Sequence, residues 1–141
     1  MDRIQDEIRR YSEENELNDP ATDDLIKEYQ ERNGVTLPLQ FIELLKKFDG
    51  GELFVPGTQI YGISSDNNSK NLTEINKLHN IFSIPDSLLI IGKENFGDFI
   101  CVDTNNGCVI QWDHENDTEF CCWNSIKEWL SEILSIKQME A

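Results

Sequence analysis

The 141-residue chain has few basic side chains, with 12 Lys and Arg against 27 Asp and Glu, and its formal net charge is −15. A protein this acidic repels nucleic acid and anionic membrane surfaces, so we expect it to bind neither directly. The same charge speeds encounter with a cationic partner, and it also keeps a protein soluble in a crowded cytosol. The composition therefore predicts either a basic partner or simple solubility, and both interpretations stay open.

No apolar run in the sequence approaches the length of a membrane span. The first residues, MDRIQDEIRR, are charged throughout, which is not typical of a signal peptide. The 13 aromatic side chains are too many for a disordered chain, and the length is sufficient for one hydrophobic core. We therefore expect one folded domain over residues 1–141, working in the cytoplasm, and the sequence predicts no oligomeric state.

Four cysteines are too few to form a disulfide scaffold in a chain of this length. Cys101, Cys108, Cys121 and Cys122 all lie in apolar segments, where a thiol behaves as a small hydrophobic side chain. No C-x2-C pair exists, and the adjacent Cys121 and Cys122 would point to opposite faces of a strand. We predict reduced core thiols and no metal; the alternative is a zinc site that recruits His114.

The sequence also lacks the phosphate-binding loop and the nucleophile elbow that many enzymes carry. One cluster has the residue types of a catalytic or metal site: His114 lies between Asp113 and Glu115, with Asp98 and Asp103 upstream. No nucleophile is paired with this histidine, so we predict a protein without catalytic residues and without a cofactor. The alternative is a small hydrolase that uses His114 with Asp113 or Asp103.

The segment from Leu88 to Trp123 organises the chain. It consists of short apolar stretches rich in aromatic and β-branched residues, each closed by a turn signal such as Gly92 or Asn105-Asn106-Gly107. This pattern is typical of an antiparallel meander. The predicted strands cover residues 88–91, 99–103, 108–112 and 120–123.

Helical spacing of apolar residues predicts helices before and after this meander. They cover about 4–11 (with Tyr11 on the apolar stripe), 20–33, 38–48, 72–78 and 126–134. Asp19, or Thr22 or Asp23 one turn later, is predicted to cap the second helix, and Asn33-Gly34 to end it. Short strands over 53–55 and 59–63 flank a turn at Pro56-Gly57, and residues 64–70 read as an exposed loop. The sequence thus predicts an α+β fold in which a central, mostly antiparallel sheet is flanked by N-terminal helices and a C-terminal helix.

Three stretches in this order resemble one family. The first runs from Leu37-Pro38 to Gly50-Gly51, and the second joins Ile84-Pro85 to the run LIIG at 89–92. The third is GDFICVD at 97–103, which leads into VIQWDHE at 109–115. Together with the closing helix after Ser125, their order and spacing over roughly residues 20–135 resemble the SUKH superfamily, which includes fungal cell-wall-assembly regulators and many bacterial immunity proteins.

This resemblance implies an α+β fold and, in bacteria, a cytoplasmic immunity protein that binds and neutralises a toxin, often a nuclease, encoded beside it. The family has no catalytic residues to carry over, so it implies neither enzyme activity nor a cofactor. The matched positions have structural interpretations. Gly97 supplies turn geometry, Asp98 and Asp103 accept hydrogen bonds from loop backbone, and Trp112 fills the core.

The acidic residues of the last predicted hairpin are the candidate contacts for such a partner. Asp113, Glu115, Asp117 and Glu119 alternate across its end, so we expect several carboxylates on one side. A nuclease toxin is expected to be basic where it meets phosphate, and an acidic protein can cover that surface. We predict that these residues bind the partner; the alternative is a solvated turn. The alternative function is a regulatory interaction module, like the fungal relatives, with no toxin.

Overall fold

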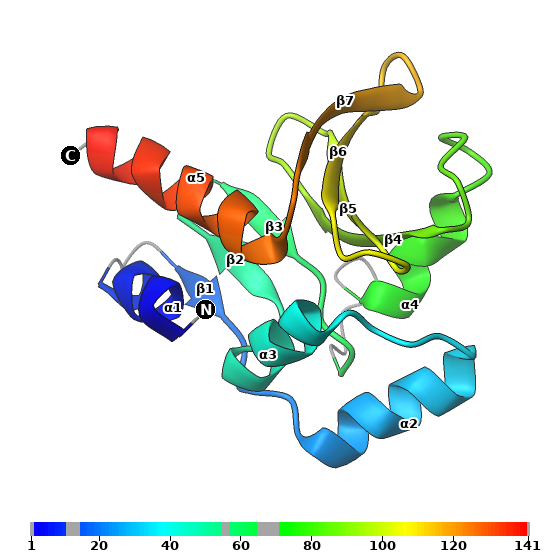
Figure 1. Ribbon diagram of the computed structural model, residues 1–141, viewed down its shortest axis with the longest axis horizontal. Coiled ribbons are helices and arrows are strands. Elements are labelled where there is room, and N and C mark those ends of the chain that lie inside the picture. The colour runs from blue at the N-terminus through cyan, green and yellow to red at the C-terminus, as the bar shows by residue number, and fades with distance from the viewer. Residues whose placement is uncertain (1, 11–14, 55–56, 65–70, 141) are drawn as a thin grey trace.

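A seven-stranded antiparallel sheet runs through the molecule. The structure, a computed structural model, describes residues 2–10, 15–54, 57–64 and 71–140. The strand order in the sheet is β1-β2-β3-β4-β5-β6-β7, so each strand pairs with its neighbour in sequence (Figure 1). The strands are β1 (Glu16–Leu17), β2 (Gly51–Leu53), β3 (Thr58–Ile60), β4 (Leu88–Lys93), β5 (Phe99–Asp103), β6 (Val109–Asp113) and β7 (Thr118–Trp123). The predicted antiparallel meander is confirmed, and it extends further toward the N-terminus than expected.

Helices flank this sheet at both ends of the chain, which confirms the predicted fold class. They are α1 (Asp2–Arg9), α2 (Asp23–Asn33), α3 (Leu39–Lys47), α4 (Leu72–Ile75) with the 3-10 turn η3 (Asn76–Leu78), and α5 (Ile126–Glu140). The C-terminal helix α5 contacts α1, α3 and β7, whereas α4 lies against β4 (Figure 1). Within the described residues, no helix has the length and apolar character that crossing a membrane requires.

The second helix starts later than its first predicted cap. The Thr22 hydroxyl accepts the Leu25 N–H at 3.2 Å, so Thr22 is the N-cap. Asp19-Pro20 instead forms part of a loop tied to the end of α3, where the Asp49 N–H donates to the Asp19 carbonyl at 3.0 Å. The helix ends at a left-handed Gly34, as predicted. Backbone bonding to α3 therefore decides where the helix begins.

Strand β1 was not predicted, because two residues carry no measurable alternation. Leu17 pairs with Gly51, whose φ is +131°. A Cβ at Gly51 would lie 2.3 Å from the Glu16 carbonyl oxygen, so only glycine allows the two backbones to approach this closely. Gly50-Gly51, which was predicted to end α3, thus also allows β1 to pair with β2.

A buried carboxylate holds the chain after β3 to the end of α3. The Asp49 side chain is 2% exposed, and its oxygens accept the backbone N–H groups of Ile63 (2.7 Å) and Ser64 (3.0 Å). The Ser64 hydroxyl also donates to this carboxylate. Satisfying several loop donors in this way is what makes a buried acidic group tolerable.

The tryptophans mark the two faces of the sheet. Trp112 is buried on one face, where its indole N–H donates to the Phe82 carbonyl at 2.8 Å. Gln111, its neighbour on β6, points to the other face, where it and Trp129 of α5 line the same cleft. Trp129 is 1% exposed. The predicted core roles of Trp112 and α5 are both confirmed.

The cysteines do not all lie in the core. All four are free thiols, but only Cys101 is buried; Cys108 and Cys121 are half-buried, and Cys122 is exposed. The prediction of a core thiol is wrong for Cys122, because β7 is an edge strand whose residues are mostly exposed. Burial raises the pKa of Cys101 to about 12, so this thiol stays protonated at neutral pH.

Several expected features fall partly beyond the described residues. Tyr11 of the first helical stripe, Pro56 of the predicted turn and residues 65–70 of the predicted loop lie outside them. Strand β2 (Gly51–Leu53) begins two residues before the predicted strand over 53–55, and β3 (Thr58–Ile60) begins one residue before and ends three residues before the predicted strand over 59–63.

Candidate functional site

A buried contact joins the turn between β4 and β5 to the hairpin of β6 and β7. Asp98 lies just before β5 and is 7% exposed. Its Oδ1 accepts a hydrogen bond from Nδ1 of the His114 ring, at 2.6 Å. The same oxygen accepts the His114 backbone N–H at 3.2 Å, and Oδ2 accepts Nε2 of Gln111 at 2.9 Å. The Asp98 carboxylate therefore fixes both the histidine ring and the end of β6.

The preceding glycine makes room for this contact. Gly97 has φ +108°, and a Cβ there would lie 2.8 Å from Nε2 of His114. Any side chain would collide with the imidazole, as well as straining the backbone. The predicted turn role of Gly97 is confirmed, and the turn is shaped to seat His114.

Electrostatics around Asp98 favour its ionised form. Burial alone would raise the pKa of this carboxyl, but hydrogen bonds from Gln111 and His114 outweigh burial and hold the pKa below its usual value. At neutral pH the site therefore contains an ionised Asp98 carboxylate hydrogen-bonded to Nδ1 of the His114 ring.

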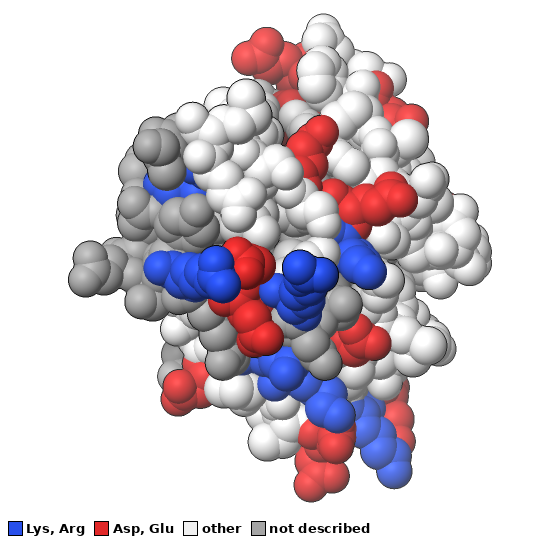
Figure 2. Space-filling view, turned by 60° about the vertical axis from the view of Figure 1, so that its left-hand side comes forward, with Lys and Arg blue, Asp and Glu red and all other residues white. Residues whose placement is uncertain are grey.

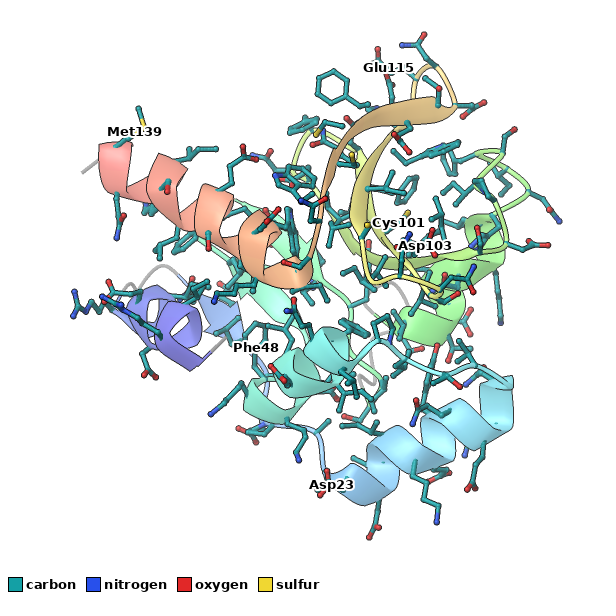
Figure 3. The ribbon with its side chains drawn as sticks, viewed as in Figure 1. Asp23, Phe48, Cys101, Asp103, Glu115 and Met139 are labelled. Carbon is teal, nitrogen blue, oxygen red and sulfur yellow. The ribbon has the colours of Figure 1, made fainter. Side chains whose placement is uncertain are left out.

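The four predicted partner contacts lie at one end of this hairpin, and we call them the acidic hairpin end: Asp113, Glu115, Asp117 and Glu119. Glu115 lies at the tip (Figure 3), and Glu115, Asp117 and Glu119 are exposed. The half-buried Asp113 shapes the turn, because its Oδ1 accepts the Glu115 N–H at 2.9 Å and its Oδ2 accepts the Asn116 side chain at 2.8 Å. Those bonds lower the pKa of Asp113.

The expectation that these carboxylates share one side through strand alternation is not met. Asp113 pairs with Thr118 and Trp112 pairs with Glu119, so Asp113 and Glu119 extend to opposite faces of the ribbon. A register shift between Gln111 and Trp112 changes the alternation that the sequence suggested. The hairpin end presents its negative charge around a tip rather than on one face.

The sequence around this hairpin contains no Lys or Arg that would compensate its negative charge. Residues 94–126 include seven Asp and Glu and no Lys or Arg. On the face containing α1 and α5, basic side chains gather across the middle and lower part with acidic ones among them, whereas the charged side chains at the upper right are acidic (Figure 2). Because the view of Figure 2 is turned about the vertical axis from that of Figure 1, the β6–β7 hairpin lies at the top in both. The negative charge is therefore unevenly distributed.

The structure does not bring Asp103 to His114, as one form of the alternative hydrolase arrangement requires. Asp103 lies at the opposite end of β5 from Asp98, about 17 Å along an extended strand, and Figure 3 shows it away from Glu115. Its carboxylate accepts the Asn105 N–H at 2.8 Å, which confirms its predicted loop role. Within the described part of the chain, no hydroxyl or thiol hydrogen-bonds to His114. The orienting carboxylate is Asp98, and no nucleophile is joined to the pair.

Asp98, Asp113 and His114 also bring one potential metal-ligand atom each within 4.8 Å of one another. This group contains no cysteine, so it does not form the zinc site that was considered from the sequence. The oxygens of both carboxylates are already acceptors for backbone or side-chain donors. The hydrogen bonds of Asp98 and Asp113 explain this grouping, because they hold the hairpin in place.

The sequence analysis missed a cleft beside this hairpin. Its volume is about 470 Å³, and it opens between α5, β2–β3, β7 and the β4–β5 turn. Phe54, Phe96 and Trp123 line it together with Glu94 and Glu132. These residues come from four separate segments, so no local pattern in the sequence could have grouped them.

Comparison with known proteins identifies the family. The profile of the SMI1 / KNR4 family (SUKH-1) matches residues 20–132. A solved structure described as a protein from Pseudomonas syringae pv. tomato superposes with a TM-score of 0.74 at 19% identity, over 93% of this chain and 98% of that one. No curated protein matches the chain. The structural likeness shows a shared fold, and the profile covers most of the sequence, including the β4–β5 turn and the acidic hairpin end. The chain belongs to the SMI1 / KNR4 family (SUKH-1).

Proposed function

We propose that the protein is an immunity protein, which binds and neutralises a cognate toxin without catalysing a reaction itself. Membership of the SUKH-1 family carries this proposal, since it supports an immunity role or a role like that of SMI1 and KNR4. The excess of acidic side chains supports a basic partner, and a nuclease-type toxin is basic where it holds phosphate. Covering that surface is sufficient for neutralisation, so no catalytic group is needed.

The acidic hairpin end is the proposed contact surface. Glu115, Asp117 and Glu119 are exposed, and no cation lies within the sequence segment around them. Exposed carboxylates at a rim act mainly on the association rate, while desolvated central contacts determine how long a complex lasts. Asp113 supports this surface by fixing the turn.

The second candidate is a regulatory protein-interaction module without a toxin, which the SMI1 / KNR4 description of the family also accommodates. Co-expression separates the two functions. The immunity function predicts that cells survive the product of the neighbouring gene only when this protein is present. If that product is harmless by itself, the regulatory function is favoured.

A charge-reversal experiment tests the contact surface. Changing Asp113, Glu115, Asp117 and Glu119 to Lys should slow association with the toxin by at least about tenfold at low salt. The defect should shrink as the ionic strength rises and the Debye length falls below about 8 Å. The matched control changes four exposed acids elsewhere to Lys, with the same change in net charge: Asp24, Glu31, Glu43 and Asp86.

The control should slow association much less than the hairpin variant does, because both variants change the net charge equally and only the hairpin variant places the positive charge at the proposed contact surface. Stopped-flow mixing at several salt concentrations measures both rates, and circular dichroism checks folding. A hairpin variant that is folded and associates as fast as the control would move the contact surface away from residues 113–119.

A further inference from the structure

The cleft beside the hairpin has aromatic and aliphatic walls. Phe96 and Ile136 form an exposed apolar rim, with 59% and 53% of their surfaces accessible, while Trp129 is buried at its base. Trp123 of β7 also lines it, and its indole N–H donates to Glu132 at 2.9 Å. A volume of about 470 Å³ is within the usual range of ligand-binding clefts. The cleft therefore offers apolar contact area that solvent now covers.

Two carboxylates stand among these apolar walls. Glu94 is half-buried, and its hydrogen-bonding partner there is the hydroxyl of Thr58, which donates to Oε2 at 3.0 Å. Across the described ranges, no Lys, Arg or His forms an ion pair with Glu94 or Glu132. Burial and the nearby charge of Asp98 raise the pKa of Glu94, although the Thr58 bond opposes them. A positive charge placed here would relieve that unfavourable environment.

We propose that this cleft receives a basic side chain, Arg or Lys, from an apolar segment of the partner protein, with Glu94 and Glu132 as its counter-charges. The proposal rests on the proposed function, because it names the part of the toxin that is held. Aromatic faces attract a cation when it is close and desolvated, which suits Phe96 and Trp123 as walls. Flanking apolar residues of the partner would cover the rim at Phe96 and Ile136.

Chain geometry connects this cleft to the acidic hairpin end. Phe96 belongs to the same turn as Asp98, and Asp98 is bonded to His114 at the start of the hairpin tip. One partner surface can therefore meet the exposed carboxylates first and insert its basic side chain beside them. In tight interfaces, charged residues at the rim usually speed association, while apolar pockets beside them bind an anchoring side chain.

The chain itself places one cation against an aromatic wall of the cleft. The Nζ of Lys137 lies 5.8 Å from the centroid of the Phe54 ring. Phe96 and Trp123 remain as the walls nearest to Glu94 in the β4–β5 turn and to Glu132. The proposed partner cation therefore uses Phe96 and Trp123 as its aromatic walls.

The first test uses the purified product of the neighbouring gene, inactivated in its catalytic centre, in calorimetric titrations. E94Q and E132Q should each weaken binding by at least about tenfold. E94Q should fold at least as stably as the natural protein, because its raised pKa means that burial disfavours the charged form. The control E31Q removes one exposed charge from α2 and should bind within about twofold.

The outcomes separate this inference from the proposed function. If the natural protein binds the toxin and both cleft variants bind equally well, the cleft proposal is wrong and the immunity function stands. If the natural protein does not bind the neighbouring product, the immunity function fails, and the cleft is then decided by the second test.

The second test needs no toxin. A blocked tripeptide with arginine between two leucines is titrated to millimolar concentration, and the indole N–H signals are followed by NMR. The signals of Trp123 and Trp129 should shift, while that of Trp112, bonded to Phe82 on the other face of the sheet, should not. The shifts should be lost in E94Q/E132Q and with the glutamine counterpart of the peptide. Equal shifts with both peptides, or none in the cleft tryptophans, would overturn the inference.

Discussion

The contact between Asp98 and His114 provides the most informative test of how the hairpin is held. Changing Asp98 to Asn keeps the shape of the side chain and removes its charge. One carboxylate oxygen now accepts from His114 and the other from Gln111, so an amide nitrogen must face a donor on one side. The variant therefore loses charge-assisted bonds and gains an unfavourable donor–donor contact at a side chain that is 10% exposed.

The size of the effect follows from these bonds. A hydrogen bond to a charged group contributes about 1.5–3 kcal/mol, against about 1 kcal/mol for a neutral one. We expect D98N to lower the free energy of unfolding by about 2–4 kcal/mol at neutral pH. The control D103N alters a half-buried carboxylate at the other end of β5 that accepts one backbone N–H, and it should cost under about 1 kcal/mol.

Acidification supplies the second half of this test. The pKa of Asp98 is lowered in the folded protein, so its stabilisation is complete above the unfolded pKa of about 3.9 and is lost as the pH falls through the folded value. The difference between the natural protein and D98N should therefore shrink below about pH 4. Urea unfolding followed by tryptophan fluorescence at several pH values measures it. A difference under about 0.5 kcal/mol at neutral pH would refute the assigned role of Asp98.

Three further predictions concern stability, each measured by urea unfolding. W129A should cost about 3–5 kcal/mol, because its ring is 1% exposed; a smaller loss would mean that α5 is not anchored there. D49A should cost at least about 3 kcal/mol, because it leaves the N–H groups of Ile63 and Ser64 without their acceptor, and an unchanged midpoint would contradict this. H79L should cost about 1–3 kcal/mol, since both ring nitrogens lie within 2.7 Å of backbone carbonyls; full stability would show that these contacts contribute nothing.

The central strands were predictable because their signals are local. Turn signals separate apolar runs of strand length: β5 lies between Gly97 and Asn105-Asn106-Gly107, β6 follows Gly107, and β4 covers the run that leads into Gly92, continuing to Lys93. Pairing of β1 was not predictable, because Leu17 joins the sheet only through close approach to Gly51, which lies distant in sequence. Edge effects also escaped prediction: Cys122 resembles a core residue by composition but lies exposed on β7.

The candidate site was only partly predictable for a related reason. Asp98 was grouped with His114 from composition, but its selection over Asp103 depends on which end of β5 meets the hairpin. The cleft depends entirely on tertiary packing, since Glu94 and Glu132 line the same cleft only when α5 folds back beside β7. Sequence patterns report neighbours along one element, whereas these contacts join different ones.

Stoichiometric inhibition of the neighbouring gene product tests the central claim most directly. The purified toxin is mixed with increasing amounts of this protein, and its remaining activity on its own substrate is measured. An immunity protein that acts by binding predicts a linear fall that ends at equimolar protein, with toxin activity recovered after the complex is separated in denaturant. Loss of activity at far below equimolar protein would indicate turnover, and undiminished activity at excess protein would show that this toxin is not its partner; either result would contradict the account.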